Sequence, residues 1–179
     1  MHEQCDCGTR VGCDLEPIAS YGDVEYVRCD GTRLPFKNSC FDLCTAWDVL
    51  EHVHDDRTML TEIARVLRPG GRARLSVPHK DISVFPPFLM PWINRRWQHS
   101  IRSGYTPSEI QSLAESANFA TCRVEALKAQ WFRSLYLVAA LLWRVCRPAG
   151  RSLVAALARR DASGEEGPNG HLLVEMEKA

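Results

Sequence analysis

Acidic residues follow three apolar, strand-like segments in the first part of the chain. Asp14 follows the core of "TRVGCDLEP" (9–17), Asp30 ends "DVEYVRCD" (23–30), and Asp48 comes directly after "FDLCTAW" (41–47). An ionised carboxylate offers two acceptor oxygens, so it suits a ligand that presents hydroxyl or amino hydrogens. Ligands of parallel sheets bind beyond the carboxyl ends of the strands. The sequence therefore predicts a ligand site at these strand ends, where Trp47 also falls.

The elements expected to position these residues alternate between strands and helices. After the third strand, Met59, Leu60 and Ile63 begin a helical apolar spacing that "EIARVLRPGG" (62–71) continues. Asp55 or Asp56 can cap this helix, and its Pro-Gly-Gly is expected to end it. The next segment, "RARLSVP" (72–78), predicts a strand.

The second half of the chain repeats this alternation. "TPSE" (106–109) predicts the start of a helix, because Thr106 can cap it and Glu109 can complete a capping box. "TCRVEALK" (121–128) and "HLLVEMEK" (171–178) predict two further strands. The order indicates an α/β fold with a mostly parallel sheet and helices on both faces.

The amino-acid composition indicates what kind of molecule the chain binds. The 179 residues are 45% hydrophobic, which is enough for the core of one domain spanning 1–179. Lys plus Arg and Asp plus Glu are 22 each, so the clustered basic excess typical of nucleic-acid binding is missing from the composition. We therefore expect a small-molecule substrate and no nucleic acid.

The eight cysteines do not have the pattern of a disulfide framework. Cys40 and Cys44 lie in apolar runs, Cys122 and Cys146 stand alone, and no signal peptide precedes them, which favours a reducing cytoplasm. The cluster at the start of the chain lacks the paired spacing of a structural zinc site, so no metal is expected; it comprises His2, Cys5, Cys7 and Cys13.

Five short motifs follow one another in a fixed order at close spacing. They are Asp30, "LPF" (34–36), Phe41-Asp42, "VLEHV" (49–53) and "EIARVLRPGG" (62–71). Together they resemble the class I S-adenosylmethionine-dependent methyltransferases, in the broad small-molecule group. The resemblance runs from about residue 9 to Phe119, the expected core at 9–119, and resumes in the last strand. It implies a Rossmann-like, mostly parallel sheet with an antiparallel last strand, and S-adenosylmethionine as cofactor.

The resemblance assigns roles to the strand-end residues. Asp14, with Leu15 beside it, would accept hydrogen bonds from the ribose hydroxyls. Asp30 would accept from the adenine amino group, while the Gly31 backbone N–H meets a ring nitrogen. A strand-end Asp is also common as a simple turn residue, and that interpretation stays open.

Two further groups would complete the cofactor site. Leu34 or Phe36 would cover the adenine face, and the Trp47-Asp48 turn would border the methionine end. Core packing is the competing interpretation for Leu34. His52 is a candidate general base, because its pKa ordinarily lies near neutrality, with a structural histidine as the alternative.

The family's first strand and its glycine-rich loop have no counterpart in this sequence. "CDCG" (5–8) lies too close to Asp14 for the helix that should intervene. We expect that residues 1–8 end that helix and that the chain begins late, through an internal start, a gene-model error or a truncation.

Two segments bear on the acceptor. Residues 79–102 form an expected substrate cover rich in aromatic residues and proline, with candidates His79, Trp92, Trp97 and His99; a loop packed on the sheet is the alternative. Residues 131–160 predict an apolar helical insertion that contacts a membrane surface, covers a lipid-like substrate, contacts another subunit, or packs on its own sheet. Residues 161–170 would be a linker to the closing strand at 171–178.

The leading hypothesis is methyl transfer from S-adenosylmethionine to a small, apolar or lipid-linked acceptor, with oxygen favoured over nitrogen and carbon. The expected location is the cytoplasm, with peripheral membrane contact as an option. The alternative is a catalytically inactive methyltransferase-like module that binds a partner, motivated by the missing glycine-rich loop. A nicotinamide dehydrogenase is disfavoured because no GxGxxG occurs.

Overall fold

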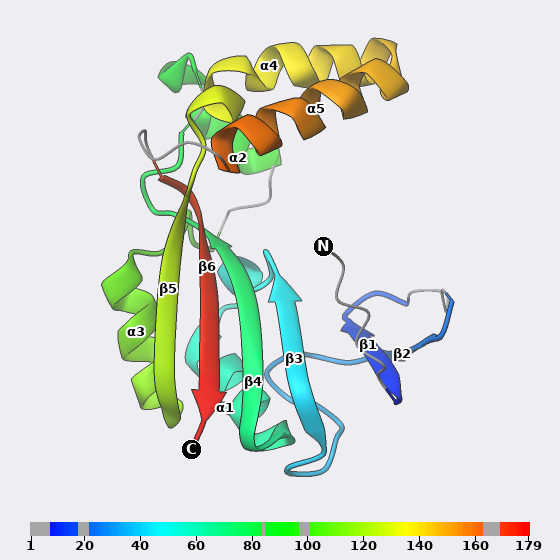
Figure 1. Ribbon diagram of the computed structural model, residues 1–179, viewed down its shortest axis with the longest axis vertical. Coiled ribbons are helices and arrows are strands. Elements are labelled where there is room, and N and C mark those ends of the chain that lie inside the picture. The colour runs from blue at the N-terminus through cyan, green and yellow to red at the C-terminus, as the bar shows by residue number, and fades with distance from the viewer. Residues whose placement is uncertain (1–7, 18–21, 84, 97–100, 163–168) are drawn as a thin grey trace.

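The strands of the computed structural model form two separate sheets (Figure 1). The structure describes residues 8–17, 22–83, 85–96, 101–162 and 169–179. Strands β1 (Arg10–Asp14) and β2 (Val24–Arg28) pair in parallel as a small sheet. The larger sheet has the order β3-β4-β6-β5, and its strands span Phe41–Trp47, Leu67–Pro78, Asn169–Lys178 and Phe119–Lys128 respectively. β3 and β4 are parallel, and β6 runs antiparallel to both neighbours.

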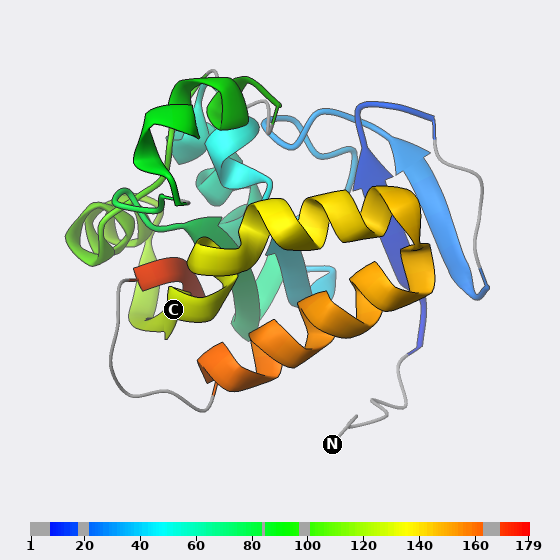
Figure 2. The same cartoon turned by 90° about the horizontal axis from the view of Figure 1, so that it is seen from above.

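The helices lie on one face of the larger sheet and beyond one of its ends. They are η1 (Leu50–His52), α1 (Asp56–Val66), η2 (Pro87–Leu89), α2 (Met90–Arg96), α3 (Pro107–Ser116), α4 (Gln130–Val145) and α5 (Arg147–Ala162). α1 and α3 contact each other and pack on the same side of β4 and β5. α4 and α5 form an antiparallel hairpin beyond the carboxyl ends of β3 and β4 (Figures 1 and 2).

The core lies between the larger sheet and the helix pair α1 and α3. Alternation along β4 creates it, because residues two apart share a face of a strand. Leu75 and Val77 are buried, whereas Arg72 and Arg74 point to the opposite, exposed face. Neighbouring strand and helix residues complete the cluster, including Leu172, Val174, Leu60, Ile63, Ile110 and Ala114.

The exposed face of the sheet carries ion pairs. Arg74 Nε lies 2.8 Å from Glu175 Oε1, and Arg72 Nε lies 3.8 Å from Glu177 Oε2. The mixed α/β class is confirmed, but within the described residues this face is not covered by helices as the alternation predicted. The charged side chains of β4 and β6 explain the difference, since such a face does not need an apolar cover.

Local capping explains where α1 and α3 begin. The Asp55 side chain accepts from the Thr58 backbone N–H at 2.9 Å, and the predicted capping box between Thr106 and Glu109 is present with both of its hydrogen bonds. Each arrangement satisfies backbone N–H groups that have no partner inside the helix. The predicted starts of both helices are therefore confirmed.

Several predicted boundaries differ from the structure. α1 ends at Val66, and the Pro69-Gly70-Gly71 stretch lies within β4, where Gly70 has a positive φ of 73°. The helical insertion spans 130–162, and the closing strand begins at Asn169. The expected linker at 161–170 is therefore shorter at both ends, and residues 163–168 lie outside the described part.

Candidate functional site

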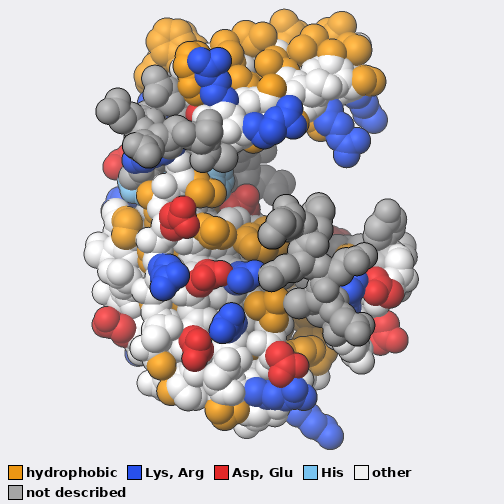
Figure 3. All heavy atoms as spheres, in the orientation of Figure 1, with side chains coloured by type: hydrophobic (Ala, Val, Ile, Leu, Met, Phe, Trp, Pro, Cys, Tyr) orange, Lys and Arg blue, Asp and Glu red, His pale blue; other side chains and the backbone are white. Residues whose placement is uncertain are grey.

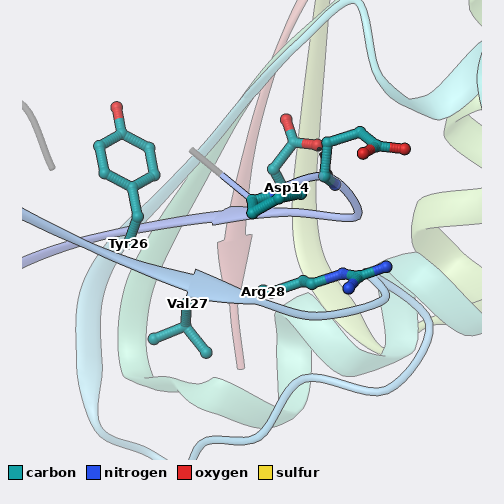
Figure 4. A pocket seen from close by; sticks show the side chains of 6 residues that line it. Asp14, Tyr26, Val27 and Arg28 are labelled. Atoms are coloured by element: carbon teal, nitrogen blue, oxygen red, sulfur yellow. Dashed lines mark hydrogen bonds between the residues drawn. The ribbon is translucent and has the colours of Figure 1, made fainter. Parts of the chain in front are cut away.

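Asp14 stands at the mouth of a small hollow at the end of β1 (Figure 4). Its Oδ1 accepts from the Glu16 backbone N–H at 2.9 Å, a turn that leaves Oδ2 without a hydrogen bond from the described residues. Arg28 Nε donates to the Leu15 carbonyl at 2.8 Å and so holds the chain after Asp14 in place. The hollow measures about 120 Å³, and Tyr26 also lines it. This volume is below the roughly 300 Å³ at which ligand pockets begin, so the hollow holds part of a ligand at most.

Asp30 organises the loop after β2. Its Oδ1 accepts from both the backbone N–H and the hydroxyl of Thr32, each at 2.8 Å. The Thr32 backbone N–H, followed by its hydroxyl, lowers the pKa of Asp30 below its ordinary value, so the carboxylate stays ionised. A Cβ added at Gly31 would lie 3.4 Å from the Met59 side chain. Asp30 and Gly31 thus lie on a loop fixed against α1.

An arginine from α1 fixes the segment that follows Gly31. The Arg65 guanidinium donates to the Leu34 carbonyl at 2.9 Å and to the Phe36 carbonyl at 2.7 Å. The same group pairs with Glu62, whose Oε2 accepts from the Leu34 backbone N–H at 2.9 Å. Leu34 is therefore held through its backbone while its side chain is half-buried.

Asp48 lies at the carboxyl end of β3 with a positive φ of 52°. Its backbone N–H donates to Ser76, and its Oδ1 accepts from the Ser76 hydroxyl at 2.7 Å. His171 Nε2 of β6 lies 3.6 Å from the same carboxylate oxygen. Neighbouring Trp47 is 54% exposed, so its indole ring is free to contact a ligand.

Glu51 is a residue that sequence reasoning missed. It is fully buried, and neither carboxylate oxygen accepts a hydrogen bond of ordinary geometry from the described residues. Burial, and to a lesser degree the charge of Asp48, raises its pKa to about 7, although its own backbone amide opposes the rise. A carboxyl group with this pKa can take or give a proton near neutral pH. The available signal was the position of Glu51 beside His52 in "VLEHV".

His52 is the exposed neighbour of this buried acid. Its Nε2 lies 3.8 Å from Glu51 Oε1, which is close enough for charge attraction but too long for a direct hydrogen bond. The Tyr105 hydroxyl hydrogen-bonds with the Leu50 carbonyl at 3.2 Å and Asp56 Oδ2 at 3.0 Å. The buried tyrosine thereby holds the short η1 turn that carries both Glu51 and His52.

The expected substrate-cover residues divide into two kinds. His79 is buried, and its Nδ1 accepts from the Asp81 backbone N–H at 3.1 Å, whereas Trp92 on α2 is 59% exposed. Trp97 and His99 lie outside the described residues. Of the two candidates within the described residues, Trp92 has the surface exposure that an apolar cover needs.

The site residues form two groups, one on each sheet. Asp14 belongs to the small sheet, whereas Asp48 and Glu51 follow β3 of the larger sheet. Figure 3 shows the surface indented between the hairpin and the rest of the molecule. In the described part of the chain, no group of three His, Cys, Asp or Glu residues could hold a metal ion. The described side chains of the site are carboxylates, an imidazole and exposed aromatic rings, which fit a ligand with hydroxyl and amino groups.

The part of the chain that carries these residues matches a known family. Residues 6–75 match the family described as "Methyltransferase domain". The chain is 33% identical over 122 residues to the ubiquinone/menaquinone biosynthesis C-methyltransferase UbiE of Xylella fastidiosa (strain 9a5c), covering 58% of this chain and 48% of that protein. It is 44% identical over 82 residues to the demethylmenaquinone methyltransferase of Corynebacterium glutamicum (strain R), covering 44% and 35%. The chain thus spans less than half the length of both relatives.

The fold is shared with a solved structure at low sequence identity. Haemonchus contortus phosphoethanolamine N-methyltransferase 2, solved with phosphomonomethylethanolamine and S-adenosylhomocysteine, superimposes with a TM-score of 0.59. The identity is 17%, and the superposition covers 87% of this chain and 38% of that one. This likeness shows the fold alone.

Proposed function

We propose that this chain, whose residues 6–75 match the family described as "Methyltransferase domain", transfers a methyl group from S-adenosylmethionine to a small, apolar or lipid-linked acceptor. The observation that carries the proposal is that the matched segment contains Asp14, Asp30 and Asp48, acidic residues at or just after the carboxyl ends of β1, β2 and β3. These are positions where a parallel sheet presents side chains to a ligand.

The nucleoside of the cofactor would be bound by Asp14 and by the loop that follows β2. Asp14 accepts hydrogen bonds from the ribose hydroxyls through Oδ2, the oxygen that its turn leaves open. Asp30 accepts from the adenine amino group, and the Gly31 N–H donates to the ring. Leu34 covers the adenine face, supported by the Arg65 hydrogen bonds to its backbone. The ionised state of Asp30 and the rigid backbone at Leu34 support these roles.

The methionine end would lie at the carboxyl end of β3. There the backbone turn at Asp48 is fixed by Ser76, and Trp47 supplies an exposed aromatic surface. When bound, the cofactor supplies an electrophilic methyl group on sulfur. The chain's part is to hold the acceptor atom in line with that methyl and to exclude water, which are positioning effects.

The acceptor is proposed to be a ring carbon of a quinol-type molecule with an apolar tail. The curated relatives are named for quinone biosynthesis and C-methylation, which favours carbon over the oxygen expected from the sequence. As the new carbon–carbon bond forms, the carbon–sulfur bond breaks and a proton must leave the acceptor. The exposed aromatic residues Trp47 and Trp92 provide the apolar surroundings that such a ring requires.

Proton removal is proposed to involve His52. Its imidazole is 36% exposed and can reach a bound acceptor, whereas Glu51 lies buried behind it. A carboxylate at this distance stabilises the imidazolium that forms when His52 takes the proton. This arrangement gives His52 the catalytic role and makes Glu51 a positioning residue. Replacing His52 by Gln should lower kcat more than it changes KM for the acceptor.

The test is methyl transfer from methyl-labelled S-adenosylmethionine to reduced demethylmenaquinone, with phosphoethanolamine as the polar comparison. The proposal predicts label in the lipid extract that depends on Asp14 and Asp30. Label on phosphoethanolamine alone would overturn the acceptor class. Absence of label on either acceptor, from a folded chain supplied with both, would overturn the assignment of activity.

The inactive-module alternative receives no support from the comparisons, because the relatives are named as methyltransferases.

A further inference from the structure

The α4–α5 hairpin presents an apolar stripe on its outer side. Trp131, Val138, Leu141 and Val145 recur every three to seven residues along α4, so they share one face of that helix. Their exposed fractions are 39%, 54%, 64% and 78%. Contiguous exposed apolar surface of this kind indicates an interaction site. Figure 3 shows the hydrophobic side chains across the outer side of the hairpin.

A second apolar segment is joined to the start of the hairpin. The Phe85 backbone N–H donates to the Arg133 carbonyl at 3.0 Å, and the Arg133 guanidinium hydrogen-bonds to the Ser83 hydroxyl. Phe85 is 65% exposed and Phe88 is 78% exposed. The two phenylalanines therefore extend the apolar stripe beyond the amino end of α4.

Specific contacts hold the end of α5 against the start of α4. Asp161 is 6% exposed, and its Oδ1 accepts from the Trp131 backbone N–H at 2.9 Å, so the end of α5 caps the start of α4. The Arg160 guanidinium lies 4.1 Å from the centre of the Trp131 ring. These contacts fix the stripe relative to the arginines around it.

The hairpin is basic although the whole chain is neutral. Its arginines are Arg133, Arg144, Arg147, Arg151, Arg159 and Arg160, and its only acidic residue is the buried Asp161. Figure 3 shows Lys and Arg side chains along the flank beneath the apolar surface. An apolar face with tryptophan, flanked by arginines, has the composition of a helix that lies in a membrane interface.

The positive charge of the hairpin favours a membrane over a second copy of the chain as the partner of its apolar face. In a symmetric dimer the same patch would face itself, so the arginines of one hairpin would lie against those of the other without an exposed acid between them. An anionic lipid surface instead attracts each arginine. Neither helix of the hairpin, nor any other described helix, is long and apolar enough to cross a membrane.

We propose that the outer face of the α4–α5 hairpin, extended by Phe85 and Phe88, docks on the surface of an anionic lipid bilayer. The apolar stripe enters the headgroup boundary, and the arginines contact lipid phosphates and carboxylates. This surface does not depend on the proposed methyl transfer, although a chain docked in this way would be close to lipid-linked acceptors.

The test is co-sedimentation of the full chain with vesicles, which needs neither cofactor nor acceptor. Vesicles of phosphatidylcholine alone are compared with vesicles that also contain phosphatidylserine as the minority lipid, at low and high salt. Binding should require phosphatidylserine and fall with salt. The double variant Arg147→Gln and Arg151→Gln should bind more weakly by about fivefold per arginine. The double variant Leu141→Ser and Val145→Ser should lose most of its binding.

A matched control separates local from overall charge. Replacing Arg72 and Arg74 by Gln removes the same charge from the exposed face of the sheet and should leave vesicle binding unchanged. Circular dichroism confirms folding of each variant. The proposal is overturned if the folded wild type does not bind vesicles, or if the hairpin variants bind them as tightly as the wild type does. It is also overturned if the wild type forms dimers instead of vesicle complexes and the Leu141→Ser and Val145→Ser variant is monomeric.

Discussion

At the scale of single residues, Glu51 is the group whose titration should be most visible. Its pKa is raised from the ordinary value of 4.5 to about 7 in the folded chain. Because the folded state holds the proton more tightly, its stabilising contribution is complete below pH 4.5 and is lost as pH rises through about 7. The full shift corresponds to about 3 kcal/mol of unfolding free energy.

Replacing Glu51 by Gln should remove this pH dependence. The unfolding free energy of the variant, relative to wild type, should increase by about 2 to 3 kcal/mol between pH 4.5 and pH 8. Urea unfolding at a series of pH values measures it. Glu115→Gln, at an exposed position of α3, serves as the control and should follow the wild-type curve. Parallel curves for Glu51→Gln and wild type would show that Glu51 does not titrate in this range.

The site residues differ in how far sequence could identify them. Asp14 and Asp30 each follow a short apolar strand, and that local pattern gives their position directly. The partners of Asp48 are Ser76 and His171, which lie far along the chain and meet it only through the pairing of β3, β4 and β6. Glu51 lies in a three-residue turn, which is too short to show the periodicity that reveals burial.

At the scale of elements, the capping box of α3 gives a direct prediction. Thr106→Ala removes the side-chain acceptor for the Glu109 backbone N–H and should lower the unfolding free energy by about 1 kcal/mol. Ser112→Ala in the exposed middle of the same helix should be neutral or slightly stabilising, because alanine has the higher helix propensity. Urea unfolding of both variants tests this, and equal effects would argue against the cap.

The hydrogen bonds of the Arg65 guanidinium give a second prediction at this scale, for the loop at residues 31–38. Arg65→Lys keeps the charge but cannot make the same set of bonds to Leu34, Phe36 and Glu62. It should cost about 1 to 2 kcal/mol of stability and speed proteolysis within that loop. Arg57→Lys, at an exposed position of α1, is the control. A cleavage rate unchanged by Arg65→Lys would mean that the loop is held by other contacts.

Element prediction succeeded where a pattern is local and failed where pairing decides. β3 spans the predicted 41–47, and its apolar run is visible in the sequence. β4 begins earlier than predicted, at Leu67, because that residue is extended and pairs with Phe41 of β3. Pro69 and the two glycines that follow it are typical of the end of a helix. In the structure they lie instead where the pairing of β3 with β4 is irregular.

At the scale of the whole molecule, the net charge of zero conceals an uneven distribution. The exposed face of the sheet pairs arginines with glutamates, whereas the hairpin holds arginines beside only one buried acid. Composition alone therefore gave no indication of a basic surface. The division of the strands into two sheets was also not predicted, since both sets have similar local patterns and only their pairing separates them.

The central claim is that the strand-end carboxylates bind the nucleoside of the cofactor. Its most direct test is calorimetric titration of S-adenosylhomocysteine into this chain, into Asp14→Asn and into the control Asp42→Asn, whose residue pairs with Arg68 at the opposite end of β3. The account predicts saturable binding that Asp14→Asn weakens by about 1 to 3 kcal/mol and that Asp42→Asn leaves unchanged. Equal affinity in all three, or no binding by the folded chain, would contradict it.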